Sequence, residues 1–242
     1  LSSVFEFSQK RPNKEKFNTS FTLGSSDLAL LVDAPISKNS GIIFSARKSY
    51  LQFLFKALQL PFLPEYNDIQ FKYLNKLSDK SELVIIGLGA IDDFSLNQGA
   101  NDGVDDLETI ERNQYILDYI PVQKQWNYTI GAHYKYFSEK GFHSVVLSRN
   151  HLNNNAVKYS NNIELEDNLV LDYLSEEIEN KFRYEYTFGI NNSELNTGFG
   201  LEQSNYTNDT YKPIPLFDGT VLPYNYNSKL NFFKYSFFSQ LT

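Results

Sequence analysis

The sequence of 242 residues contains no cysteine and no methionine, and it has three histidines and one tryptophan. The lack of cysteine excludes disulfides, thiolate-bound zinc and thiol catalysis. No run of about 18 apolar residues occurs, so the sequence holds no transmembrane helix. The net charge of −7 argues against a nucleic-acid partner, because such a protein needs basic patches to displace counterions from phosphates.

Aromatic residues, in contrast, are abundant: they make up 16% of the chain, with 20 phenylalanines and 17 tyrosines. The mean hydropathy is nevertheless −0.41. A disordered chain would lack the aromatic residues. A chain that is polar on average but rich in tyrosine and phenylalanine is typical of many half-exposed strands, each with one apolar face.

The stretch WNYTIGAHYKYF, residues 126–137, alternates between apolar and polar side chains with a period of two, as a strand with two different faces does. One face would carry Trp126, Tyr128, Ile130, Ala132, Tyr134 and Tyr136, and the other Asn127, Thr129, Gly131, His133 and Lys135. Aromatic pairs near both ends bracket two smaller residues, as in a strand that crosses a membrane between two aromatic girdles. We therefore predict that the first face meets lipid and the second faces a lumen.

Nine further segments have strand character, and most of them alternate in the same way. Most have the length of about 9–11 residues that a tilted transmembrane strand needs. The ten candidate strands are Lys16–Gly24, Asp27–Ala34, Gly41–Tyr50, Asp68–Leu77, Glu82–Asp92, Gln125–Phe137, Phe142–His151, Glu177–Phe188, Glu194–Tyr206 and Leu230–Thr242.

The connections between these strands alternate in length. PISKNS, SDKS, SEKG and GINNS are short polar turns, whereas the links 51–67, 93–124, 152–176 and 207–229 are long; GSSD is short where a long link is due. Short turns at one end and long loops at the other predict an all-β fold: an antiparallel up-and-down transmembrane β-barrel, present as a partial barrel of about ten strands. A soluble β-sandwich or lectin-like sheet is the alternative that the residues leave open.

Three other patterns were considered as sites. Residues 85–92, IIGLGAID, begin like a dinucleotide-binding turn but lack the third glycine and the helix, so we interpret Gly87 and Gly89 as strand residues beside bulky neighbours. Residues 51–63 are partly helical in pattern and would form a short helix on the barrel rim, with a substrate lid as the alternative. No Ser-His-Asp grouping or nucleophile elbow is present, so no catalytic residue is assigned and an enzyme is not expected.

Metal sites have little support in the sequence. Residues 97–111 gather Asp102, Asp105, Asp106, Glu108 and Glu111, but their spacing is not that of an EF-hand loop. A solvated acidic extracellular loop is the simpler interpretation, and a structural Ca²⁺ or a contact with a cationic ligand is the alternative. A hairpin at SEKG would place His133 and His143 on opposite faces, which excludes a shared zinc ion. We therefore assign no metal and no cofactor.

Several segments resemble TonB-dependent outer-membrane receptors of the Bacteroidota type. LSSVFEF, residues 1–7, resembles the last plug strand, and residues 32–55, VDAPISKNSGIIFSARKSYLQFLF, look like an early barrel hairpin, although Ala34 and Lys48 replace a frequent Gly and Arg. LPFLPEYNDIQFKY, IGLGAIDDF, QYILDYIPVQKQWNYTIGAHYKYF and LSRNHLNNNA are also similar to that subgroup. The resemblance implies two parts: residues 1–9 as the end of a plug domain, and residues 10–242 as the N-terminal part of the barrel.

The resemblance further implies a function. A TonB-dependent receptor in the outer membrane of a Gram-negative cell imports an iron chelate, cobalamin, an oligosaccharide or a peptide. Its implied partners are outer-membrane lipid, the TonB complex acting through a plug segment, the nutrient and sometimes a surface lipoprotein. Ligand-binding residues cannot be carried over and stay unknown. A passive porin or adhesin barrel is the alternative, and a soluble carbohydrate-binding β-module is a further one.

Overall fold

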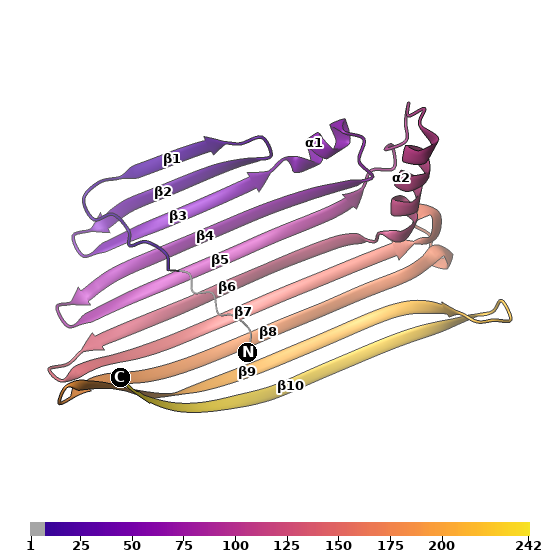
Figure 1. The fold of residues 1–242 in the computed structure, drawn as a ribbon. Coiled ribbons are helices and arrows are strands. Elements are labelled where there is room, and N and C mark those ends of the chain that lie inside the picture. Colours follow the sequence, from indigo (N-terminus) through magenta and orange to yellow (C-terminus); the bar gives the residue numbers. More distant parts are fainter. Residues whose placement is uncertain (1–7) are drawn as a thin grey trace.

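The structure, a computed structural model, describes residues 8–242, so residues 1–7 of the expected plug strand lie outside it. Ten strands form one antiparallel sheet in which each pairs with its neighbours in the sequence, from β1 to β10 (Figure 1). The strands are β1 (Asn18–Leu23), β2 (Asp27–Ser37), β3 (Ser40–Ser49), β4 (Phe62–Ser78), β5 (Ser81–Leu96), β6 (Val122–Phe137), β7 (Gly141–Tyr159), β8 (Leu169–Ile190), β9 (Ser193–Pro215) and β10 (Val221–Leu241). The expected meander is thereby confirmed.

The strands of the second half are longer than predicted, and two long links were wrong. β7 connects to β8 through residues 160–168 instead of the expected link 152–176. β8 and β9 contain 22 and 23 residues, and β9 connects to β10 through residues 216–220 instead of the expected link 207–229. The region is rich in Asn, Thr and Tyr, a composition that suggested a loop in the sequence. In the structure, β9 and β10 nevertheless pair without interruption through it. A membrane crossing takes about 9–11 residues, so these strands continue well beyond one bilayer.

The four short hairpins are displaced from one another in a single direction. Ser40, at the start of β3, pairs with Asn75, and β4 continues beyond that residue to Ser78. Gly141, at the start of β7, pairs with Phe188, and β8 likewise continues to Ile190. A sheet must have a consistent stagger of this kind in order to curve into a barrel with tilted strands.

The register divides the side chains into two faces with different chemistry. We call the face that carries Ile130 the apolar face and the face that carries Thr129 the polar face. Along the middle of the sheet, the apolar face presents Leu30, Phe44, Ile69, Ile85, Ile130, Leu147, Phe182, Leu201 and Tyr235, all placed by pairing between neighbouring strands. Ile130 and Leu147 are 45% and 53% exposed. Since such exposure costs free energy in water, this face requires a partner.

Gly87 illustrates why small residues occur within the apolar face. Its register partner Phe71 lays an aromatic ring over the glycine, and a Cβ at residue 87 would overlap ring atoms. Residues 85–92 lie wholly within β5, which continues to Leu96, so no helix begins directly after the glycines. The interpretation of this glycine as a strand residue beside a bulky neighbour is confirmed.

Helical segments lie at the end of the sheet opposite the short hairpins (Figure 1). α1 (Leu51–Ala57) confirms the expected rim helix, and Phe55 packs edge-on against Phe62 of β4 at 5.5 Å between ring centroids. α2 (Leu107–Tyr119) was not expected, because the acidic residues before it suggested a loop. Two short 3-10 turns, η1 (Ser160–Asn162) and η2 (Glu166–Asn168), connect β7 to β8. No helix among residues 8–242 is both long enough and apolar enough to cross a membrane.

α2 forms because Asp106 caps its N-terminus: the side chain accepts a hydrogen bond from the Thr109 backbone N–H at 3.0 Å. Asn113 and Leu117, one helical turn apart, are the buried residues of this helix. At its other end, the Lys158 ammonium of β7 donates to the Leu117 carbonyl. A cation at the C-terminal end complements the helix dipole. The capping aspartate followed by an apolar periodicity was the sequence signal for this helix.

Candidate functional site

The polar face carries a network of alternating charges across β8, β9 and β10. The Lys181 Nζ lies 2.8 Å from a Glu179 carboxylate oxygen and 3.6 Å from Glu202, and the Lys234 Nζ lies 2.7 Å from Glu202. Arg183 and Glu185 form a further ion pair on the same face. Charged groups of both signs in such number need water around them, so this face lines an aqueous or protein-filled space.

The described segment before β1 lies against the polar face (Figure 1). We call residues 8–13 the N-terminal strap. Asp33 of β2 is 6% exposed and accepts two hydrogen bonds from it, from the Lys10 Nζ at 2.9 Å and from the Asn13 backbone N–H at 2.7 Å. A buried carboxylate with two donors from one segment holds that segment in a defined position.

Three more contacts extend the strap across the neighbouring strands. Arg11 Nη2 lies 2.6 and 2.7 Å from the two carboxylate oxygens of Glu82 on β5. The Lys72 Nζ of β4 donates to the Gln9 carbonyl at 2.8 Å. Gly41 of β3 leaves room for the strap, because a Cβ there would lie 2.8 Å from the Pro12 Cβ. The strap therefore touches four consecutive strands on the polar face, from β2 to β5.

The histidines fall where the hairpin at SEKG predicted. His133 is on the polar face and shares a 2.8 Å hydrogen bond with Ser144. His143 is on the apolar face, where its Nδ1 lies 2.8 Å from the Tyr184 hydroxyl and its ring stacks on Tyr186 at 4.3 Å. The prediction that His133 and His143 lie on opposite faces is confirmed.

The five acidic side chains of residues 97–111 do not converge on one point. Asp102, Asp105, Asp106, Glu108 and Glu111 are all exposed. Asp106 is the helix cap, and hydrogen bonds from Thr109 lower the pKa of its carboxyl below the ordinary range. Within residues 8–242, no group of three or more His, Asp or Glu side chains is arranged to hold a metal ion.

The sequence analysis missed a row of polar side chains on the apolar face. Arg149 of β7 donates from Nε to the Tyr128 hydroxyl at 3.0 Å and from Nη1 to the Asn180 Oδ1 at 2.9 Å. Asn180 in turn donates to Gln203 at 3.4 Å, so the row crosses β6, β7, β8 and β9. The alternation within residues 142–151 placed Arg149 on the same face as Leu147, and this was the available signal.

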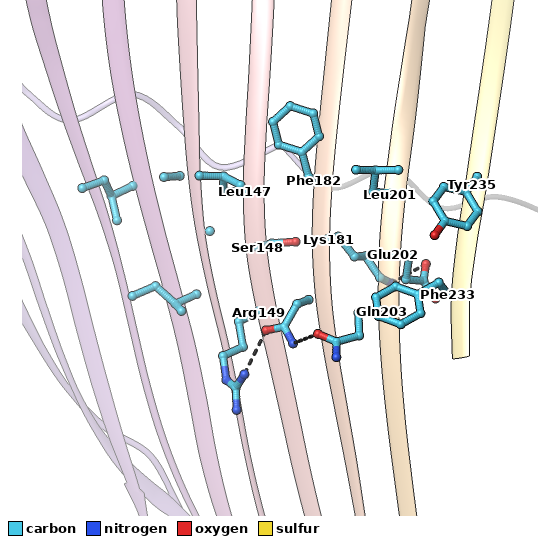
Figure 2. A pocket seen from close by; sticks show the side chains of 15 residues that line it. Leu147, Ser148, Arg149, Lys181, Phe182, Leu201, Glu202, Gln203, Phe233 and Tyr235 are labelled. Atoms are coloured by element: carbon cyan, nitrogen blue, oxygen red, sulfur yellow. Dashed lines mark hydrogen bonds and ion pairs between the residues drawn. The ribbon is translucent and has the colours of Figure 1, made fainter. Parts of the chain in front are cut away.

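A groove of about 720 Å³ lies beside this row, and Figure 2 shows the side chains that line it. Leu147, Phe182, Leu201 and Tyr235 line its apolar part on four consecutive strands, on the side nearer the short hairpins. Arg149 and Gln203 lie on its other side. The groove is thus apolar at one end and cationic at the other.

Comparison with solved structures gives the architecture a precedent. The copper transporter OprC superposes with a TM-score of 0.62 over 96% of this chain, at 8% sequence identity. The ferric-catecholate import receptor Fiu from Escherichia coli K12, in its closed form, has a TM-score of 0.55 over 96% of this chain at 11% identity. The ferric enterobactin receptor PfeA from Pseudomonas aeruginosa has a TM-score of 0.53 over 89% of it at 10% identity.

The fold matches part of the β-barrels of these solved structures. The predicted fold class is confirmed, since ten antiparallel strands of one open sheet match a portion of these structures. The chain spans 35% of OprC, 39% of Fiu and 38% of PfeA. No protein-family model and no curated protein matches the sequence. At these identities the likeness concerns the fold of the partial barrel, and the Bacteroidota type stays a prediction.

Proposed function

We propose that this chain forms part of the wall of a TonB-dependent outer-membrane receptor that actively imports a nutrient. The observation that carries the proposal is the contrast between the two faces of one staggered sheet. Ile130 and Leu147 stand half-exposed on the apolar face, while Lys181, Glu202 and the strap occupy the polar face. A barrel whose outside meets lipid and whose inside holds water and a plug requires this distribution.

The contacts of the strap support the proposed division of the chain into the end of a plug domain and a part of the barrel. Residues 1–9 are proposed as the end of a plug domain and residues 10–242 as the N-terminal part of the transmembrane barrel. A segment arriving from a plug must reach the barrel wall from the inside, and the contacts of Lys10 with Asp33 and of Arg11 with Glu82 lie on the polar face. A passive porin has no plug to tether, so these ion pairs favour the receptor over that alternative.

The orientation follows from the two ends of the sheet. The tight hairpins would face the periplasm, while the end with α1, α2 and the longest strand extensions would face the outside. The nutrient would bind at that outer end. The proposed nutrient classes are an iron chelate, cobalamin, an oligosaccharide and a peptide. The similar solved structures are a copper transporter, a ferric-catecholate import receptor and a ferric enterobactin receptor, which supports the metal-chelate class. The TonB complex and a surface lipoprotein are the proposed protein partners, and no enzymatic step is proposed.

Uptake in deletion strains tests this function. Cells lacking the gene, and separately cells lacking TonB, would be supplied with radiolabelled members of each nutrient class at concentrations too low for diffusion. We expect one class to lose uptake in both strains and to regain it in the first when the gene is restored. Uptake that depends on the gene but continues without TonB would contradict active import and identify a passive porin.

A further inference from the structure

We propose that the groove beside Arg149 is a binding site for one phosphorylated lipid of the outer leaflet, with an acyl chain in the groove and a phosphate at the guanidinium. This inference rests on the proposed function, which places the apolar face in the outer membrane with the α2 end outward. It adds a ligand on the outside of the barrel, distinct from the nutrient.

The charge of Arg149 lacks an ionic partner on the protein. Its two hydrogen-bond acceptors, the Tyr128 hydroxyl and the Asn180 amide oxygen, are neutral. No carboxylate of residues 8–242 forms an ion pair with it, whereas Lys181, Arg183 and Lys234 on the opposite face all have one. A guanidinium facing lipid without a counter-ion is costly, and the anion that a membrane offers at this place is a lipid phosphate.

The geometry leaves the guanidinium ready for such a phosphate. Nε and one hydrogen of Nη1 are used by Tyr128 and Asn180, and Nη2 has no hydrogen-bond partner in the described part of the chain. These two neutral contacts fix the plane of the group, so its remaining N–H groups form a fork of the kind that binds phosphate oxygens in pairs. A lysine in the same place would offer a point charge without that fork.

Arg149 pairs with Ile130 near mid-depth, but its side chain extends toward the α2 end, where the guanidinium meets the Tyr128 hydroxyl and approaches the headgroup level, as long basic side chains in a membrane do. Trp126 and Tyr128 stand on the adjacent strand β6, and the Trp126 ring packs edge-on against His151 at 4.7 Å. Tryptophan and tyrosine collect at membrane–water interfaces. Each later short hairpin extends farther along the strand direction than the one before it. Paired residues on later strands therefore lie farther from the hairpin ends, so the row from Arg149 to Gln203 approaches the membrane–water interface at the α2 end.

The groove fits the rest of the lipid. Leu147, Phe182, Leu201 and Tyr235 extend from the polar row toward the short-hairpin side, which is the direction that acyl chains take from an outer-leaflet headgroup. The volume of about 720 Å³ exceeds what a single water or ion would occupy, and most of its lining is apolar. A soluble anion would bind the Arg149 guanidinium without filling the groove. A cationic group next to an apolar groove therefore fits an amphiphile.

Native mass spectrometry of the intact protein tests the site. The protein would be folded in bicelles that contain lipid A carrying its phosphates or lipid A stripped of them, and the lipids that remain bound would be counted. We expect the phosphorylated form to be retained and Arg149→Gln to lower its retention about tenfold or more, as loss of a charge-assisted contact implies. Lys135→Gln removes a charge from the polar face of β6 and should leave retention unchanged.

Leu147→Trp provides a second test that keeps the charge. It fills the groove at a position that is 53% exposed, where a large side chain is tolerated, and should also lower retention. Unchanged retention in Arg149→Gln or in Leu147→Trp, or equal retention of the stripped lipid, would overturn the proposal. Heat-modifiable gel mobility is scored in parallel. Failure of the wild-type protein to insert would contradict the proposed membrane function. Normal insertion with the same number of bound lipids in the wild type and both variants would contradict the lipid site alone.

Discussion

Arginine substitutions on the two faces of β6 are a sharp test of which face of the sheet meets lipid. Ile130 lies on the apolar face of β6, 45% exposed, and pairs with Gly87 on one side and Arg149 on the other. An arginine at mid-depth on a lipid face costs about 2–4 kcal/mol. Because Arg149 stands directly opposite, like-charge repulsion adds to this cost, and we expect Ile130→Arg to fall in the upper half of that range.

Thr129→Arg changes the neighbouring residue on the polar face. The Thr129 hydroxyl donates to the Asn150 Oδ1 at 2.8 Å, so the substitution loses one hydrogen bond, about 1 kcal/mol. The new charge then lies in a lumen that already contains His133 and Lys135 and costs little more. The expected difference between the two variants is therefore about 2 kcal/mol or more.

The assay is urea-dependent folding of the intact protein into lipid vesicles, read by heat-modifiable gel mobility, with Ile130→Leu as a control for change of shape. Ile130→Arg should lower the unfolding midpoint strongly, while Thr129→Arg and Ile130→Leu should remain near the wild type. The reverse order would show that the faces are assigned backwards. Equal effects of the two arginines would show that this strand does not separate lipid from lumen.

Three further predictions follow from single contacts. Gly87→Ala should destabilise the folded protein by about 1–3 kcal/mol, because the added methyl meets the Phe71 ring; Gly87→Ala combined with Phe71→Leu should recover stability in urea unfolding, and failure to recover would contradict the overlap. Gly41→Ala should displace the strap and raise protease cleavage within residues 8–13 without loss of the barrel, whereas unchanged cleavage would show that the strap does not depend on this close approach. Since the pKa of Asp106 is lowered in the folded protein, its contribution to α2 is full above the ordinary aspartate range and is lost as the pH falls through the lowered value; amide exchange in α2 should accelerate there, and Asp106→Asn, which keeps the cap without titrating, should abolish that acceleration.

The sequence was sufficient for the order of strands, because alternation and turn composition are local signals. Residues 126–137 and the turn at SEKG predicted both the faces of β6 and its pairing with β7. The extensions of β8, β9 and β10 could not be predicted in this way. There both faces are polar, as at Asn208 and Asn227, so the period of two disappears although the backbone ladder continues.

The functional features were harder to predict because they depend on partners distant in sequence. The strap contacts Asp33 and Glu82 through charges that look like ordinary surface residues in the sequence. The role of Arg149 could not be predicted, because a single arginine in an alternating strand has no special meaning until its partners on neighbouring strands are known. The polar-face ion pairs that join neighbouring strands likewise form between residues about twenty or more positions apart, such as Lys181 and Glu202.

Accessibility of nitroxide labels along β6 tests most directly whether the apolar face meets lipid and the polar face meets water. The chain has no cysteine, so single cysteines introduced at residues 126–136 label one position each. In protein folded into vesicles, labels at even-numbered positions should collide mainly with oxygen, which dissolves in lipid, and labels at odd-numbered positions with a water-soluble nickel chelate. Oxygen and nickel accessibilities that do not alternate, or that alternate in the opposite phase, would contradict a membrane-spanning barrel wall with this orientation.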